Sequence, residues 1–192
     1  MIRIGVVGDI GSGKSYVAKQ FDYPVFNADL EVSKLYNKDR KIYIKLKKAL
    51  PSYIISYPIK KKKLTEAILS NIKNLKKINK VVHPLIKKKM NNFLKKNKMK
   101  KIVILDIPLF LENKLNKKND IILFVDAKKK QIEKRLKKRK NFNPEIVEKL
   151  KKFQLPLEIK RKKSSYILIN NFTNISVKKN VKKLVKKILL NA

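Results

Sequence analysis

One stretch near the amino terminus, GDIGSGKS at residues 8–15, constrains the fold of this chain more than any other feature. It follows a β-branched apolar run at 2–7 and precedes a predicted helix that begins near Ser15. All four glycines of the 192 residues lie between Gly5 and Gly13. Because glycine accepts positive φ angles and close approaches at little steric cost, this clustering predicts a sharply curved loop between a strand and a helix.

The spacing of this loop matches G-x-x-x-x-G-K-[ST] in full, a pattern whose backbone amides bind the phosphates of a nucleotide. In this interpretation the Lys14 ammonium reaches the β- and γ-phosphates of ATP, and the Ser15 hydroxyl ligates Mg²⁺. The residues predicted to form this part of the site are Gly8, Asp9, Ile10, Gly11, Ser12, Gly13, Lys14, Ser15 and Tyr16. A glycine turn without a ligand is the alternative, but it needs no Gly-Lys-Ser at fixed spacing.

Apolar runs of strand length recur along the chain and alternate with helical patterns. They lie at 2–7, 23–26, 101–108, 120–127 and 165–170, and a closing amphipathic helix is predicted at 177–190. Continuous apolar strands that alternate with helices indicate a parallel sheet covered on both faces. The sequence therefore predicts an α/β chain with a P-loop NTPase-type three-layer fold around a central parallel sheet.

A long lysine-rich segment, about 37–97, separates the second and third predicted strands. Its pattern is helical without clear strands, and Pro51, Pro58 and Pro84 are expected to divide it into short helices. The segment is too long for a plain crossover. We therefore interpret it as a helical insertion within a single domain spanning 1–192.

The composition is strongly basic, with 51 Lys and Arg against 14 Asp and Glu and a formal net charge of +37. Such a charge suits a polyanionic partner such as nucleic acid or an anionic membrane. However, only five of these residues are arginine, the side chain that nucleic-acid readers favour, which leaves 51 − 5 = 46 lysines spread over the predicted helices. We interpret the charge as compositional drift toward A/T-rich codons at tolerant surface positions.

The chain contains no cysteine, which excludes disulfides, thiolate metal sites and a cysteine nucleophile. No run approaches the roughly 20 apolar residues that cross a bilayer. The amino terminus lacks the long apolar region and cleavage site of a signal peptide. We expect a cytoplasmic protein without a membrane partner.

A phosphate-binding loop of this kind identifies ATP or GTP but not the reaction. GTPases need an NKxD-type motif at the end of a strand, whereas the nearest match, NKKND at 116–120, precedes one. The chain is also too short for a typical helicase. Its length, its helical insertion and a basic segment late in the sequence favour a small-molecule kinase.

Six motifs, in order from residue 2 to residue 171, resemble those of the dephospho-CoA kinase family. They are IGVVGDIGSGKS, FNADLEVSKLY (the family's DAD segment), VVHPLI (its His-Pro motif), LDIPLFLEN (its D-x-PLLFE motif), QIEKRLKKR (its basic helix) and QLPLEIKRKKSSYILINN (its Gln…Lys…Asn ending). Each motif is short, and their order makes the set specific.

This resemblance implies transfer of the ATP γ-phosphoryl group to the ribose 3′-hydroxyl of dephospho-CoA, giving coenzyme A and ADP, with Mg²⁺ as cofactor. It implies that the helical insertion binds the acceptor and that a basic lid, about 139–155, folds over ATP. Dephospho-CoA is then the small-molecule partner. We expect no specific nucleic-acid partner, and a monomer or weak homo-oligomer.

Asp29 is the predicted catalytic base. It begins a helix just after the second predicted strand, where a carboxylate accepts the proton of the acceptor hydroxyl and orients it toward the γ-phosphate. An N-cap aspartate is the alternative role. The first Asp of the family's DAD is Asn27 here, which removes a charge near the metal and leaves Asp29 in place.

Further acidic and loop residues are assigned around the acceptor and the metal. Asp106 ends the third predicted strand and is expected to bind Mg²⁺ through water, with a strand-end cap as the alternative. The resemblance places Pro108, Leu109 and Glu112 against the acceptor, although Glu112 fits a solvated loop acid equally well. His83, the only histidine, is assigned to substrate binding, with a structural histidine before proline as the alternative.

Arginine is rare in this chain, so Arg135 and Arg139 in the basic segment indicate planar, bidentate phosphate contacts. Arg139 is the predicted phosphate clamp and shares the catalytic role with Lys14 and Asp29, and Arg135 is a further ATP contact. A solvated helix face is the alternative for both arginines. The Gln…Lys…Asn ending implies an adenine-side contact at Asn170.

Two departures from the family fall near that ending. The family's Ala-Asp before the last strand is Ser164-Ser165 here, and the glycine after the paired asparagines is Phe172. Both departures weaken the adenine-side assignment, while the phosphate-binding loop and Asp29 are unaffected.

Two other functions stay open. The first is another P-loop kinase that acts on a nucleoside or nucleotide, which a substrate panel would separate. The second is a basic nucleic-acid-binding protein with a regulatory ATP site, which predicts selective and steeply salt-dependent binding of DNA or RNA.

Overall fold

The computed structural model describes residues 1–139 and 142–191, and the chain divides into two compact units. The first unit comprises 1–27, 97–142 and 151–192. The second comprises 28–96 and 143–150.

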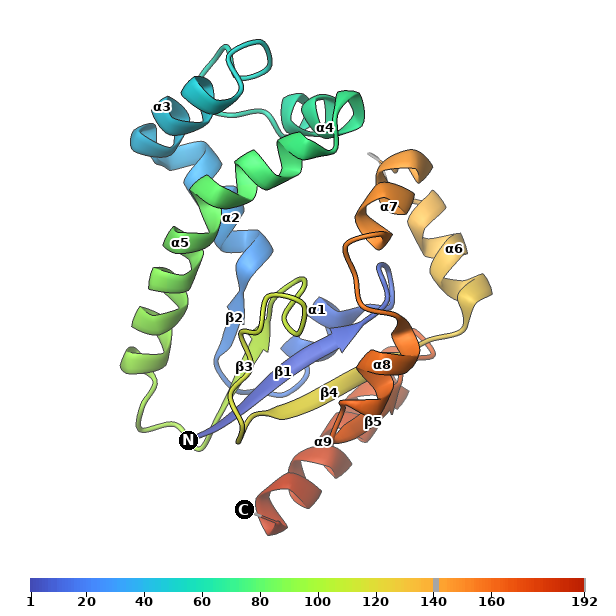
Figure 1. Cartoon of the computed structure of the whole chain (residues 1–192). Helices are drawn as coiled ribbons and strands as arrows, with labels where there is room; N and C mark the ends of the chain where they lie inside the picture. The colour runs from blue at the N-terminus through green and yellow to red at the C-terminus, as the bar shows by residue number, and fades with distance from the viewer. Residues whose placement is uncertain (140–141, 192) are drawn as a thin grey trace. The chain divides into compact units, whose positions relative to one another are not determined.

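A parallel sheet, five-stranded within the described residues, forms the centre of the first unit (Figure 1). Its strands are β1 (Ile2–Gly8), β2 (Val25–Asn27), β3 (Ile102–Asp106), β4 (Ile121–Asp126) and β5 (Tyr166–Ile169), in the spatial order β2-β3-β1-β4-β5. Because all pairs are parallel, the carboxyl ends of the strands lie along one edge. The chain moves to one side of β1 for β2 and β3 and to the other for β4 and β5, so the direction of winding reverses at β1.

Helices cover both faces of this sheet. α1 (Lys14–Lys19) and α9 (Asn174–Leu190) pack on one face, where Val17 and Val181 join a buried cluster with residues of β1, β3, β4 and β5. α8 (Leu157–Lys162) contacts β1 and crosses in front of the sheet in Figure 1, where α1 lies behind it. Every residue of β3 is buried, as expected for a parallel strand covered on both sides. The predicted α/β, P-loop NTPase-type fold is confirmed.

The second unit is helical. It contains α2 (Ala28–Lys38), α3 (Arg40–Ala49), α4 (Lys61–Ser70), α5 (Lys73–Lys96) and most of α7 (Pro144–Lys151). α5 contacts α2, α3 and α4 through a buried stripe formed by Leu75, Ile78, Val82, Ile86 and Met90. Spacings of three and four residues place this stripe on one side of the helix. The function of 37–97 as an acceptor-binding insertion stays a prediction.

The structure corrects one local prediction and adds one helix. Pro84 does not divide the lysine-rich segment, because α5 runs through it without interruption. A proline removes only one hydrogen bond of the helix interior, and the buried stripe continues on both sides of it. The sequence also did not indicate α8, whose six residues are too few to show a helical period.

Among the described residues, no helix combines the length and apolar character that crossing a bilayer requires.

Candidate nucleotide and acceptor site

The predicted phosphate-binding loop connects the carboxyl end of the central strand β1 to α1. Polar residues stand at the same edge of the sheet on the neighbouring strands. Asn27 ends β2, Asp106 ends β3 and Asp126 ends β4, while Asn170 follows β5 directly. Ligands of open parallel sheets bind outside this edge, where the strand order reverses. The topology therefore brings the loop and these polar groups together.

The loop depends on glycine at two positions in particular. Gly11 and Gly13 have φ angles of 88° and 89°, in the left-handed region that other residues rarely adopt. A Cβ on Gly11 would lie 3.0 Å from side-chain atoms of Ile132 and Leu136 on α6 (Lys129–Lys137). A Cβ on Gly13 would collide with the Asn170 side chain. Backbone conformation and close packing both exclude larger residues here.

Gly5 has a different role from the glycines of the loop. It lies inside β1, and the ring of Phe110 fills the space that a Cβ would occupy. Phe110 is 1% exposed, so this contact belongs to the core under the loop that follows β3. The four glycines therefore cluster for two reasons. The loop needs glycine for its backbone conformation, and the core needs Gly5 to make room for the Phe110 ring.

Lys14 folds back over its own loop. Its ammonium donates hydrogen bonds to the carbonyl oxygen of Asp9 at 2.7 Å and to that of Gly8 at 3.3 Å. The Ser12 amide donates to the same Asp9 carbonyl at 3.2 Å, and the Ile10 amide donates to Asp9 Oδ1 at 2.6 Å. These bonds fix the curvature of the loop and hold the ammonium against its backbone.

Asn170 is a buried support of the loop. Its Nδ2 donates to the Ser12 carbonyl at 2.8 Å, and its Oδ1 accepts from the Phe172 amide at 2.8 Å. Its own amide donates to the Asp126 carbonyl at 2.7 Å, and the residue has no exposed surface. Both ends of the side chain are thus engaged by the protein itself. The adenine-side contact assigned to Asn170 stays a prediction.

Ser164 and Ser165 lie at the opposite edge of the sheet from Asn170. The Ser165 amide donates to the Ile122 carbonyl at 2.9 Å, and the Ile122 amide donates to Ser165 Oγ at 3.3 Å. The Ser164 hydroxyl donates to the Lys160 carbonyl at 2.7 Å. Since these bonds lie at the amino ends of β4 and β5, this departure from the family is remote from the phosphate-binding loop.

Asp106, Ser15 and Asn27 form a hydrogen-bonded group at this edge. The Ser15 hydroxyl and the Asn27 amide both donate to the Asp106 carboxylate, and Asn27 lies opposite Asp106 in the strand register. Burial raises the pKa of Asp106 above its ordinary value of 3.8, against the opposing effects of the Ser15 bond and the Lys14 charge. Asn27 thus gives Asp106 a hydrogen-bond donor where the family's aspartate would add a second negative charge.

This group fits a magnesium ion. Mg²⁺ prefers oxygen ligands and is usually held by one or two carboxylates together with waters and substrate phosphates. The Ser15 hydroxyl and the Asp106 carboxylate supply such oxygens beside the phosphate-binding loop. Within 1–139 and 142–191 there is no cluster of three or more His, Asp or Glu side chains, so phosphates and waters would complete the coordination.

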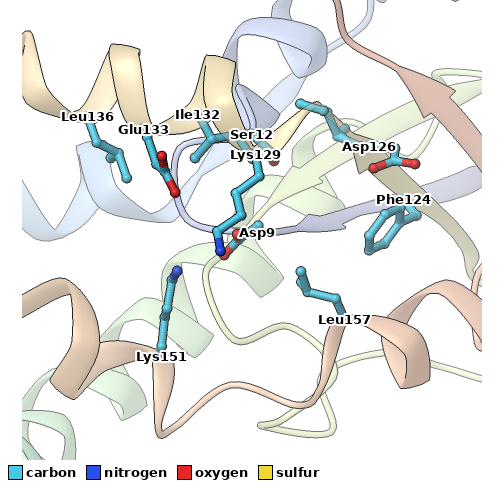
Figure 2. A pocket seen from close by; sticks show the side chains of 12 residues that line it. Asp9, Ser12, Phe124, Asp126, Lys129, Ile132, Glu133, Leu136, Lys151 and Leu157 are labelled. Carbon is cyan, nitrogen blue, oxygen red and sulfur yellow. The ribbon is translucent and has the colours of Figure 1, made fainter.

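A cavity of about 350 Å³ lies beside the loop, lined by residues of β4, α6 and α8 (Figure 2). Asp9 and Ser12 line it from the loop, and Leu157 lines it from α8. In Figure 2 the ammonium groups of Lys129 and Lys151 point toward Asp9. Ser12 is 1% exposed, and its hydroxyl has no hydrogen-bond partner in the described part of the chain. Charged side chains of both signs therefore line the cavity beside the loop.

Glu112 forms a buried ion pair and is therefore not a solvated loop acid. It lies 2.9 Å from the Lys160 ammonium, and the two side chains are 10% and 4% exposed. Glu112 also accepts from the Leu155 amide at 3.0 Å, and Lys160 donates to Gln154 at 2.7 Å. Burial is the largest single effect and opposes ionisation of Glu112, but the bond from Lys160, the backbone hydrogen bonds and the Lys160 charge together outweigh it and lower the pKa below its ordinary value of 4.5. The ion pair ties the loop after β3 to α8, and the Leu155 bond ties it to the segment before α8.

Pro108 and Leu109 belong to the same loop as Glu112. Pro108 is exposed, and Leu109 is partly exposed with a φ angle of 56°. These two residues are therefore more accessible to a ligand than the carboxylate of Glu112.

Arg135 and Arg139 are both exposed at the end of α6 (Lys129–Lys137). The Arg135 guanidinium lies over the ring of Phe172, with its central carbon 4.5 Å from the ring centre. The Arg139 amide donates to the Leu136 carbonyl at 3.0 Å, just beyond the helix. The predicted lid, 139–155, includes residues 140 and 141, which lie outside the described residues.

Asp29 and His83 belong to the second unit. Asp29 is exposed in the first turn of α2, inside the helix and so not its N-cap, two residues beyond the end of β2. Burial, and then the nearby Asp29 charge, raise the pKa of Tyr36 on the same helix to about 12. His83 is exposed on α5 beside Pro84, and partial desolvation lowers its pKa below the ordinary value of 6.5.

Comparison with known proteins gives a consistent result over almost the whole chain. A family model described as dephospho-CoA kinase matches residues 2–176. A curated protein of that name from Wolbachia pipientis wMel is 33% identical over an alignment of 193 residues, gaps included, that covers 98% of this chain and 98% of that protein. The crystal structure of TT1252 from Thermus thermophilus has a TM-score of 0.80 at 27% identity, covering 98% of this chain and 97% of that chain. A dephospho-CoA kinase structure from Campylobacter jejuni, at 21% identity, has a TM-score of 0.63, covers 97% of this chain and 96% of that chain, and supports the fold.

Proposed function

Because the chain belongs to the dephospho-CoA kinase family, we propose that it transfers the γ-phosphoryl group of ATP to the ribose 3′-hydroxyl of dephospho-CoA, giving coenzyme A and ADP. Membership makes the chain an ATP-dependent kinase of coenzyme A biosynthesis. The observation that carries the residue-level proposal is the phosphate-binding loop at the carboxyl edge of the sheet, with Lys14, Ser15 and Asp106 gathered there.

The loop binds the phosphates of ATP. Its amides, at the amino terminus of α1, present donors and a partial positive charge to an anion. Lys14 exchanges its bonds to the Gly8 and Asp9 carbonyls for bonds to the β- and γ-phosphates. Charge on the transferring group is then stabilised by donors that are already in place, which is the main source of catalysis in phosphoryl transfer.

Ser15 and Asp106 would hold Mg²⁺, Ser15 directly and Asp106 through water. When bound, this ion neutralises charge on the β- and γ-phosphates. Asn27 keeps the Asp106 carboxylate oriented toward Ser15 through its amide.

Asp29 accepts the proton of the 3′-hydroxyl and orients that oxygen for attack. Its exposure in the first turn of α2 leaves the carboxylate accessible to an acceptor. Pro108, Leu109 and His83 contact the acceptor, and Glu112 holds the loop that carries Pro108 and Leu109.

The basic lid, 139–155, closes over ATP, and Arg139 contacts its phosphates. Closure would exclude water and suppress ATP hydrolysis. We further propose that the enzyme acts in the cytoplasm as a monomer or weak homo-oligomer and has no specific nucleic-acid partner, since its charge is carried mainly by lysine.

The test is to incubate the purified full chain with Mg·ATP and dephospho-CoA, and in parallel with a panel of nucleosides and nucleotides. We expect coenzyme A, identified by chromatography and by the phosphorus NMR signal of a 3′-phosphate, and no turnover of the panel. Lys14→Ala should abolish the reaction, whereas Lys178→Ala on the exposed side of α9 should leave it unchanged. Phosphorylation of a panel member without formation of coenzyme A would support the rival kinase instead.

A further inference from the structure

Phe172 stands in a backbone conformation that favours glycine. It lies in the turn between β5 and α9 with a φ angle of 63°, in the left-handed region where a bulky side chain is strained. Its amide is held there by the buried Asn170 side chain at 2.8 Å. The turn therefore keeps an aromatic residue where glycine would fit with less strain.

The ring lies directly beside the phosphate-binding loop. Its edge is 3.3 Å from the position that a Cβ on Gly13 would take, one residue before Lys14. The Tyr16 hydroxyl donates to Asn174 at 2.9 Å, which connects α1 to the start of α9 next to the same turn. Phe172 is thus within reach of the nucleoside part of any nucleotide whose phosphates bind the loop.

The face of this ring is covered by a solvent-exposed arginine. Arg135 lies over the ring at 4.5 Å but is exposed on α6, and the ring itself is only partly buried. A guanidinium is planar and stacks on aromatic faces, and it stacks equally on a nucleobase. A flat ligand entering between the two groups would exchange one stacking contact for two.

We propose that Phe172 is a base-stacking residue of the nucleotide site, with Arg135 stacked on the other face of the base. The proposal rests on the proposed function, because it takes ATP as the nucleotide on the loop. It assigns to Phe172 the affinity for the nucleoside part, whereas Lys14 and the loop amides bind the phosphates. Stacking on an aromatic side chain accepts every base, so this contact alone sets affinity and not the choice among bases.

The experiment compares a nucleotide with a base-free polyphosphate. Calorimetric titration of the full chain with ADP and with tripolyphosphate, both in Mg²⁺, is carried out on wild type, Phe172→Gly and Phe172→Leu. Phe172→Gly removes the ring and the strain together, and Phe172→Leu keeps an apolar side chain without a π-face. We expect both variants to bind ADP about tenfold more weakly, with tripolyphosphate binding unchanged. Ile175→Ala, at an 85% exposed position three residues away, is the matched control and should bind both ligands as wild type does.

Variants of Arg135 separate stacking from a phosphate contact. Arg135→Lys keeps the charge but loses the planar group, so a stacking role predicts weaker ADP binding with tripolyphosphate unaffected. Arg135→Gln should behave in the same way. Equal loss of ADP and tripolyphosphate binding in Arg135→Gln, with full recovery in Arg135→Lys, would assign the residue to the phosphates and overturn its part of the proposal.

The kinetic counterpart is a split between KM and kcat. Phe172→Leu should raise the KM for ATP about tenfold and leave kcat within twofold, because the reacting groups are untouched. Unchanged ADP binding in both Phe172 variants, or an equal loss of ADP and tripolyphosphate, would overturn the proposal while the kinase activity stands. A wild-type protein that binds neither ligand would overturn the proposed function as well.

Discussion

At the scale of single residues, two carboxylates assigned to the acceptor side have different environments. Asp29 is exposed on the first turn of its helix, where a substrate hydroxyl can approach it. Glu112 is buried and paired with Lys160, and it accepts a backbone bond from Leu155. The first environment suits proton transfer, and the second suits holding a loop in place. Two substitutions test this difference.

Asp29→Asn should fold normally and lose most turnover. A general base contributes about 10²- to 10⁴-fold to the rate, so kcat should fall by that factor while ADP binding stays unchanged. The lost first-turn charge costs at most about 1 kcal/mol of stability. Steady-state kinetics with calorimetric ADP titration measures both effects, and Asp22→Asn, at an exposed aspartate beyond α1, is the matched control. A kcat near that of wild type would remove Asp29 from the mechanism.

Glu112→Gln should destabilise the fold, because it leaves the Lys160 ammonium buried without its counter-charge. Breaking such a pair costs about 3 kcal/mol or more in the free energy of unfolding. Since the pKa of Glu112 is lowered on folding, its contribution is present above its ordinary pKa of 4.5 and is lost as the pH falls through the folded value. The stability difference between wild type and variant should therefore shrink below about pH 4.5.

Urea unfolding of wild type and Glu112→Gln from about pH 7 to about pH 3 measures this dependence. Glu158→Gln changes an exposed carboxylate on α8 and should shift stability by less than about 0.5 kcal/mol. A difference between wild type and Glu112→Gln that is constant over the whole range would show that the pair does not act through its charge.

At the scale of elements, α5 shows how burial outweighs local preference. Pro84 removes the amide that would donate to the Lys80 carbonyl and crowds the preceding turn. The helix nevertheless extends from Lys73 to Lys96, because its apolar stripe is buried on both sides of the proline. The sequence rule that proline ends a helix fails where tertiary contacts stabilise both flanking turns.

Pro84→Ala should therefore stabilise the protein. An interior proline costs up to about 3 kcal/mol relative to alanine, and each kcal/mol corresponds to about 2–4 °C in Tm for a chain of this size. Pro51→Ala, in the turn after α3, should have no effect or lower the Tm slightly, because there proline restricts the unfolded chain. Thermal unfolding followed by circular dichroism distinguishes the two, and a lower Tm for Pro84→Ala would contradict this account.

At the scale of the whole molecule, the feature that most affects stability is the excess of positive charge. The formal charge is +37, and the seventeen residues of α9 include six lysines and no acid. Lysines four residues apart on a helix repel each other, and a large net charge destabilises a compact state through self-repulsion. Because these side chains are solvated, salt should screen most of this repulsion.

The Tm should rise with ionic strength. Between about 0.01 M and about 0.15 M salt, the Debye length falls from about 30 Å to about 8 Å, so repulsion between exposed lysines weakens. Lys178→Glu combined with Lys186→Glu, both exposed on α9, should raise the Tm at low salt and reduce its salt dependence. Differential scanning fluorimetry over a salt series measures both, and a Tm that falls with added salt would contradict the repulsion argument.

The sequence alone determined the class of fold and supplied the prediction of where the nucleotide binds, because both depend on local features. Glycines at fixed spacing, a lysine and a hydroxyl within eight residues, and strand-length apolar runs need no knowledge of distant residues to be interpreted. The order of six motifs along the sequence was also enough to identify the family, and the comparisons confirm that family.

Only the tertiary structure decided what surrounds these features. Asn170 donates a hydrogen bond to the Ser12 carbonyl, 158 residues away in the sequence. Glu112 forms an ion pair with Lys160. The Arg135 guanidinium stacks over the Phe172 ring beside the loop. The parallel order of the sheet creates these pairings by aligning the carboxyl ends of strands that are far apart in the chain. Whether a charged or aromatic side chain is buried, paired or accessible follows from that alignment, and no local pattern of residues encodes it.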